Sequence, residues 1–83
     1  MWGSPSRNRI IYELRVTEER IREIDFRIMD LKKRRASIFG KFFFTDLDRA
    51  EIARIDRRIA ELEYIREELR RRASYLRYLL SRY

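Results

Sequence analysis

Cysteine and histidine are both absent from this sequence of 83 residues. Their absence excludes disulfide bonds, thiol chemistry and the usual zinc sites. It also removes the side chain that most often serves as a general base. Carboxylates remain, but none lies in a context that suggests a pocket. We therefore expect a protein that is not an enzyme, holds no metal or cofactor and has no small-molecule substrate.

Glycine and proline are also scarce, and their positions predict the fold. After Pro5 neither residue occurs until Gly40, which suits the left-handed position that ends a helix. Thr45 begins the next segment and resembles a capping box with Asp48. We predict an all-α fold in which a helix at about 6–39, a loop at 40–45 and a helix at about 46–82 form an antiparallel hairpin. Ser4, Ser6 or Asn8 caps the first helix.

Residues 1–5 resemble a leader left by an expression vector, so the domain is predicted to span 6–83. Abundant arginine and glutamate, with no glutamine, are typical of thermophile proteins and of de novo helical designs alike. Both origins stay open. No apolar run is long enough to cross a bilayer, and we expect a soluble protein, cytoplasmic if natural.

Apolar residues follow heptad spacing in both predicted helices, which indicates a two-helix coiled coil. The first series is Ile10, Leu14, Thr17, Ile21, Ile24, Ile28, Leu31, Arg35 and Ile38. The second is Asp48, Ile52, Ile55, Ile59, Leu62, Arg66, Leu69, Ala73, Leu76, Leu80 and Tyr83. Further apolar residues lie off these seams: Val16, Phe26, Met29, Ala53, Ala60, Tyr64, Ile65, Tyr75 and Leu79. We therefore predict that the hairpin pairs into a four-helix bundle or a higher cyclic homo-oligomer, with a dimer favoured.

The predicted interface combines seam residues with aromatic residues from both ends of the hairpin. Its members are Ile21, Ile24, Ile28, Ile55, Ile59, Leu62, Leu69, Phe42, Phe43, Phe44, Tyr75 and Tyr78. The three loop phenylalanines have two interpretations. The favoured one is that some of them fold back with Ile38 and Leu47 to close the end of the bundle, and the other is that they form an exposed contact surface.

Basic residues exceed acidic ones by seven, which favours an anionic partner such as nucleic acid. They cluster near the loop and near the chain termini, at Lys32, Lys33, Arg34, Arg35, Arg70, Arg71 and Arg72. These residues are the candidates for anion binding. The clusters surround the helices and do not follow one face, so a solvated collar is favoured over a nucleic-acid surface.

Three polar residues interrupt the seams, namely Thr17, Arg35 and Arg66. The register of the hairpin predicts that Thr17 and Arg66 lie at similar depth. They either form a buried polar layer or, as is favoured for the arginines, extend out of the seam. On the helix surfaces, spacing predicts five i,i+4 ion pairs. These are Glu18–Arg22, Glu23–Arg27, Asp30–Arg34, Glu67–Arg71 and Glu68–Arg72.

The stretch 24–31, followed by Arg35, resembles the first helix of the all-helical chorismate mutases. The segment 46–49 resembles the start of that family's second helix. The resemblance implies that Arg35 binds a substrate carboxylate, as a remote alternative function. The sequence departs from the family pattern at Glu18, where an arginine is expected, and at Asp46, where a lysine is expected.

Overall fold

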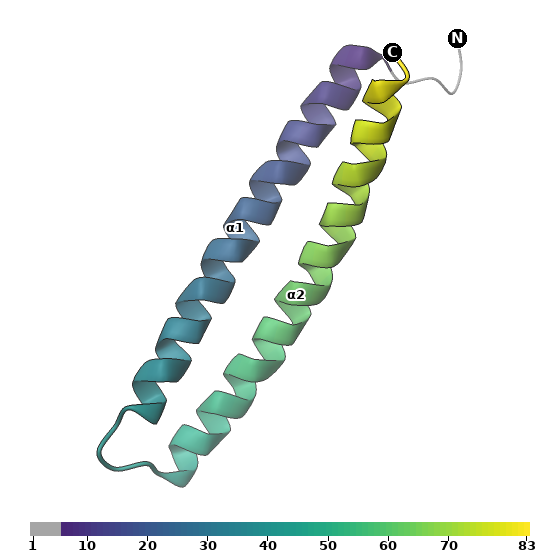
Figure 1. The fold of residues 1–83 in the computed structure, drawn as a ribbon. Coiled ribbons are helices and arrows are strands. Elements are labelled where there is room, and N and C mark those ends of the chain that lie inside the picture. The colour runs from purple at the N-terminus through teal and green to yellow at the C-terminus, as the bar shows by residue number, and fades with distance from the viewer. Residues whose placement is uncertain (1–5) are drawn as a thin grey trace.

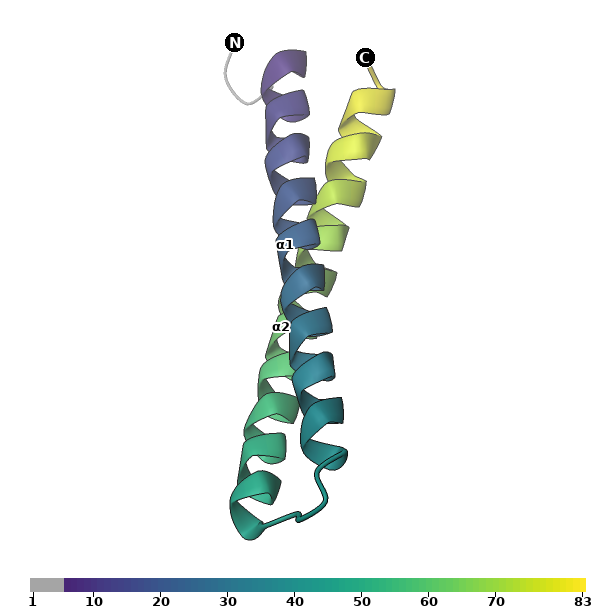
Figure 2. The ribbon, with the colours of Figure 1, turned by 90° about the vertical axis from the view of Figure 1, so that its left-hand side faces the viewer.

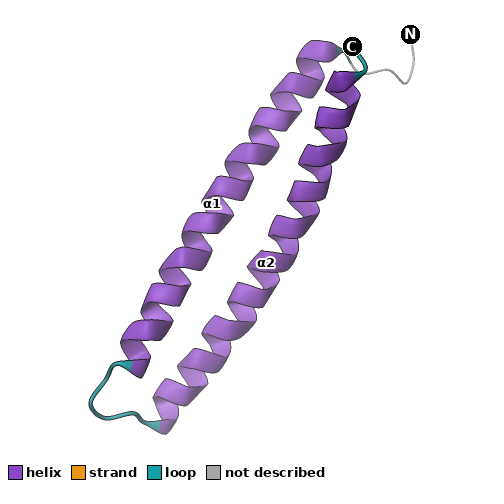
Figure 3. Cartoon of the chain, in the orientation of Figure 1, coloured by secondary structure: helices purple, strands orange, loops and turns teal. Residues whose placement is uncertain are grey.

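A computed structural model describes residues 6–83 and shows two long helices that run antiparallel, side by side (Figures 1 and 3). Helix α1 spans Arg7–Phe39 and helix α2 spans Asp46–Ser81, and these are the helices among the described residues. The predicted helical hairpin is therefore confirmed, with both helices within one residue of their expected bounds. The predicted leader lies outside the described residues.

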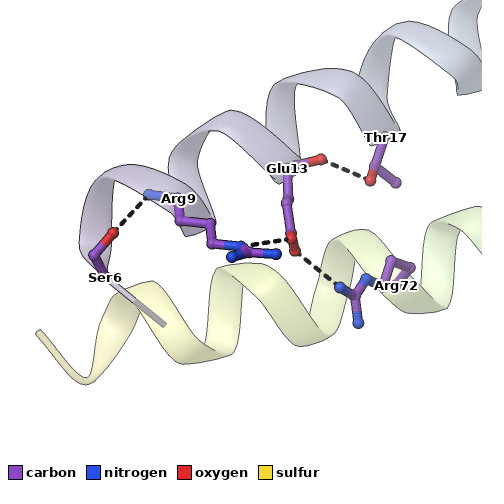
Figure 4. Close-up of polar contacts among 5 residues, drawn as sticks. All are labelled: Ser6, Arg9, Glu13, Thr17 and Arg72. Atoms are coloured by element: carbon purple, nitrogen blue, oxygen red, sulfur yellow. Dashed lines mark hydrogen bonds and ion pairs between the residues drawn. The ribbon is translucent and has the colours of Figure 1, made fainter. Parts of the chain in front are cut away.

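Helix α1 begins at Ser6, whose side-chain oxygen accepts a hydrogen bond from the backbone N–H of Arg9 at 3.2 Å (Figure 4). Its C-terminal end differs from the prediction. Gly40 has φ −81° and ψ −3°, so the left-handed cap expected there is wrong. The Gly40 N–H donates to Ala36 O, and Lys41 N–H donates to Ile38 O. Two carbonyl groups of the last turn are thus satisfied while the backbone stays right-handed.

Helix α2 begins with a complete capping box, as predicted. Thr45 Oγ1 accepts from the Asp48 N–H at 3.2 Å, and Asp48 Oδ2 accepts from the Thr45 N–H at 2.9 Å. Asp48 is almost fully buried, and its second oxygen accepts from Lys41 Nζ at 2.9 Å. One carboxylate therefore joins the loop to the first turn of α2.

These bonds hold the pKa of Asp48 below its ordinary value, chiefly through the Lys41 hydrogen bond and then the Thr45 backbone bond. A lowered pKa means that the ionised form stabilises the fold, and this contribution is present above the unfolded-state pKa. We expect it to be lost as the pH falls below about 4. Urea unfolding at neutral and acidic pH should show a smaller acid-induced loss for Asp48→Asn than for the parent. An equal loss in both proteins would contradict this role.

The seam residues form the core between the helices, as the heptads predict. The larger cluster lies toward the loop and contains Ile28, Ile38, Ile52, Ile55, Ile59 and Leu62, with Ile24 and Leu31 packed against it. Toward the termini, Ile10, Ala73 and Leu76 are buried. Figure 2 shows the helices crossing near their middle and diverging toward the chain termini. There, Leu14, Leu79 and Leu80 remain only half-buried.

The molecule is a rod and not a globule. Its Cα radius of gyration is 18.6 Å, whereas a compact domain of this length is expected to have about 12 Å. Its principal extents are 64 × 16 × 14 Å. Every core residue of so narrow a rod therefore has the opposite helix on one side and lies within one side chain of solvent on the other.

Neither described helix holds a segment apolar enough to cross a membrane.

Candidate association surface

One side of the hairpin, near the loop, carries exposed apolar residues bordered by charged ones. Met29 and Ala36 of α1 lie on it together with Ala53 and Ala60 of α2, and all four are exposed. On each helix these residues lie seven apart, so each pair shares a face. We call this surface the alanine face. The equivalent off-seam positions on the other side of the hairpin are filled by Asp30, Ser37, Arg54 and Glu61.

An aromatic stack continues the alanine face toward the loop. The rings of Phe39 and Phe44 are parallel, with centroids 5.7 Å apart. The Arg35 guanidinium lies 4.9 Å from the Phe39 centroid, and that of Arg49 lies 6.0 Å from the Phe44 centroid. Cation–π contacts of this kind hold exposed rings in place. The stack therefore gives the loop end of this side an ordered apolar edge.

Phe42 and Phe43 form the tip of the loop and are directed into solvent. Their exposed fractions are 94% and 76%, and the two rings meet edge to face at 5.1 Å. Leu47 is also exposed, whereas Ile38 is buried. The favoured expectation, that some of the loop phenylalanines fold back to close the end of the bundle, is therefore wrong for Phe42 and Phe43, whereas Phe44 folds back onto Phe39. The six-residue loop connects two helix ends and leaves its side chains no core to reach.

Two grooves lie along the same side as the alanine face. The central groove, of about 610 Å³, has Ile28, Met29 and Ala36 in its lining, with Lys32 and Arg66 among its charged residues. The distal groove, of about 450 Å³, lies closer to the termini. It is lined by Glu18, Ile21, Arg22, Arg70, Ala73, Ser74 and Arg77. Both are open to solvent, so each can receive a side chain from another molecule.

The predicted interface residues fall into three groups in the structure. Ile28, Ile55, Ile59 and Leu62 are buried between the two helices of one chain, so little of their surface remains for a second copy. Ile21 is half-buried beside the distal groove, whereas Ile24 and Leu69 are half-buried beside a separate groove that also includes Glu23 and Ile65. The exposed members are Phe42, Phe43, Phe44, Tyr75 and Tyr78. Of the predicted interface residues, the last two groups are therefore the ones whose side chains still have surface open to solvent.

Most of the basic candidates are engaged in ion pairs within the hairpin. Across the helices these are Arg34–Glu51, Arg35–Asp56 at 2.7 Å and Arg72–Glu13 at 2.9 Å. Figure 4 shows Glu13 between Arg72 and Arg9. Within α2 they are Arg71–Glu68 at 2.7 Å and Arg70–Glu67 at 4.0 Å. Lys32 and Lys33 line the central groove.

The five expected i,i+4 pairs do not form among residues 6–83. Four of their five arginines pair with other acids. Within one helix, Arg22 pairs with Glu19 at 2.6 Å and Arg71 with Glu68, and across the hairpin Arg34 pairs with Glu51 and Arg72 with Glu13. Arg35, which the chorismate mutase resemblance assigns to a substrate carboxylate, instead donates to Asp56. For Arg34 and Arg72 the partner belongs to the second helix, which helix-surface spacing alone does not describe.

Charge varies along the rod in three zones when the two helices are matched by depth. The open end, 6–20 with 70–83, has nine basic and three acidic residues, a net charge of +6. The middle, 21–31 with 59–69, has three basic and seven acidic, a net charge of −4. The loop end, 32–58, has nine basic and four acidic, a net charge of +5. Two positive ends therefore flank a negative middle.

Arg66 is the polar seam residue with the least satisfied side chain. Its Nη1 donates to Asp25 at 2.9 Å, but within residues 6–83 its buried Nε has no acceptor. Thr17 bonds within its own helix, to Glu13 O at 2.7 Å. Asp25 lies two turns from Thr17, so the expectation that Thr17 and Arg66 share one depth is wrong. Arg35 leaves the seam to reach Asp56, as the favoured interpretation expected.

Arg66→Met is expected to stabilise the hairpin by about 1 kcal/mol. Methionine keeps the aliphatic volume of the side chain and removes the buried donor that lacks an acceptor. Urea unfolding followed by circular dichroism measures the change. Arg58→Met is the control, because Arg58 bonds only exposed Glu61 and its replacement should be nearly neutral. A loss of stability for Arg66→Met would show that the Asp25 pair outweighs the unpaired nitrogen.

No model of a known protein family matches the chain, no curated protein is significantly similar to it, and no solved structure matches it. Within residues 6–83 there is also no cluster of acidic side chains suited to a metal ion.

Proposed function

We propose that this chain is a self-associating structural protein, a helical hairpin whose role is to assemble with further copies of itself, in the first instance as a dimer. The observation that carries the proposal is the exposed apolar surface of the alanine face and the loop tip. Exposed apolar side chains that lie together and are rimmed by charge are typical of protein contacts. The adjacent grooves provide room for the side chains of a second copy.

The surface area of the hairpin supports the same proposal. The chain exposes 6970 Å², whereas a folded monomer of 10.4 kDa is expected to expose about 5400 Å². The surplus exceeds the roughly 800 Å² that each partner buries in a standard interface. A two-helix rod has only one helix–helix contact, and a four-helix bundle adds the missing ones. Association of two copies would therefore supply burial that one copy lacks.

Sedimentation equilibrium at micromolar concentration tests the proposal. We expect a mass of at least twice 10.4 kDa, which dissociates on dilution. The control is Ala53→Glu with Ala60→Glu, which places two charges on the alanine face without touching the core. This variant should stay helical and become monomeric. A parent protein that is monomeric throughout the concentration range would overturn the proposal.

Nucleic acid binding is the second candidate, and the net charge of +6 at the open end favours it. The exposed side chains of Tyr75 and Tyr78 lie in this zone and offer rings for base stacking. A gel shift with single-stranded and duplex DNA, repeated at rising salt, is the test. Binding that weakens steeply with salt supports this candidate, because released counterions drive such binding. Absence of a shift at low salt removes it.

A further inference from the structure

We propose that two copies pair through their alanine faces in an antiparallel, offset arrangement, with the loop end of each copy over the middle of the other. This inference rests on the proposed self-association and specifies its geometry. The partner is a second copy of this chain. The arrangement closes on itself through a two-fold axis, so it gives a dimer and not a filament.

Charge complementarity sets the offset. Full antiparallel overlap would place the open end, at +6, against the loop end, at +5. Full parallel overlap would place each positive end against its own equivalent. An offset that brings each loop end, at +5, over the partner's middle, at −4, replaces repulsion by attraction at both halves of the contact. The two open ends then project in opposite directions, away from each other.

The lengths of the charge zones determine which residues of the two copies face each other in this offset arrangement. On α2 the loop end and the middle comprise 46–69, which is about 36 Å at the helical rise, out of about 54 Å for the whole helix. The two copies therefore overlap over about two-thirds of their length. The two-fold axis passes near residue 58 of α2. Positions on the two α2 helices whose numbers sum to about 116 then face each other.

This register matches the residues that border the alanine face. Arg49 of one copy lies opposite Glu67 of the other, and Ala53 lies opposite Glu63. All four follow the three- and four-residue steps of one helix face. Within its own chain Glu67 has only a 4.0 Å contact with Arg70, and the Glu63–Arg66 distance is 3.7 Å. Both carboxylates are thus available to a second copy.

The same register also gives the exposed loop tip a place to bind on the partner. Residues at the start of α2 and in the preceding loop lie opposite position 70 of the partner's α2. That position belongs to the distal groove, which includes the apolar Ile21 and Ala73 between charged walls. Phe42 and Phe43 are the exposed side chains at this level. Each loop tip therefore enters the partner's distal groove, where the arginines of the rim contact the ring faces.

Disulfide trapping between single-cysteine variants tests the register, because the chain has no cysteine of its own. The Arg49→Cys protein is mixed with Glu67→Cys in one sample and with Arg77→Cys in another, and both are oxidised. All three positions lie on the same face of α2, and 67 and 77 differ by about 15 Å along the helix. The offset dimer predicts at least tenfold more mixed disulfide with Glu67→Cys. Oxidation of the same mixtures in denaturant gives the collision background.

Each other outcome overturns the register and has a separate meaning. Preferential trapping with Arg77→Cys indicates full antiparallel overlap. Trapping of neither pair above background, in protein whose sedimentation mass is that of a dimer, shows that a different face or direction is used, and self-association survives. Trapping of neither pair in protein that sediments as a monomer overturns self-association itself.

Discussion

Leu62→Ala should lower the free energy of unfolding by about 2–5 kcal/mol, the range expected when a buried leucine is truncated. Leu62 is only 4% exposed and belongs to the cluster that contains Ile28 and Ile59. A two-helix rod has no second layer of side chains that can collapse into the resulting cavity. Because domains of this size have only about 5–15 kcal/mol in total, much of the stability would be lost. Urea unfolding followed by circular dichroism measures the difference.

Leu47→Ala is the matched control for this change. Leu47 lies on the same helix, loses the same atoms on truncation and is 81% exposed. We expect a change within about 0.5 kcal/mol, as is usual for surface positions. The comparison must be made at protein concentrations below the dimerisation range, so that the intrachain core alone is measured. Equal losses at both positions would contradict the assignment of Leu62 to the core of one chain.

The fold was predictable because its signals are periodic and repeated. The alternation of three- and four-residue steps identifies the core residues of both helices, and Thr45 with Asp48 marks the start of α2 to the residue. Even the alanine face is visible in part, since Met29, Ala53 and Ala60 lie off the seams. Each of these features depends on residues that are near one another in sequence.

The depth at which the helices match was predicted less well, for a physical reason. Helix α2 begins beyond the end of α1, because the loop extends further along the rod after Gly40 before Thr45 caps the second helix (Figure 1). Arg66 therefore lies within hydrogen-bonding reach of Asp25 and not at the depth of Thr17. The loop itself has no period, so nothing in its composition distinguishes buried phenylalanines from exposed ones. The ion pairs between the two helices depend on the same matching of depth, so the sequence did not predict them either.

Replacement of Phe42 and Phe43 together by alanine should weaken dimerisation by well over tenfold while leaving the stability of the single hairpin unchanged. The two rings are exposed and contact each other, so their removal costs the isolated chain little. In the offset dimer each ring is buried in the partner's distal groove, and burial of a phenylalanine contributes about 1.5–3 kcal/mol. Sedimentation equilibrium measures the dissociation constant, and urea unfolding at low concentration measures the hairpin.

The matched control replaces Phe26 and Tyr64 by alanine. These side chains are also exposed aromatics, at 68% and 69%, but they lie on the outer faces of α1 and α2, away from the seam and the alanine face. Their loss removes a similar aromatic area without touching the proposed contact, so the dissociation constant should stay within about twofold, equivalent to roughly 0.4 kcal/mol. Equal weakening by the two double variants would mean that exposed aromatic area in general, and not the loop tip in a groove, drives association. A dimer unaffected by loss of Phe42 and Phe43 would require a contact that leaves the loop in solvent.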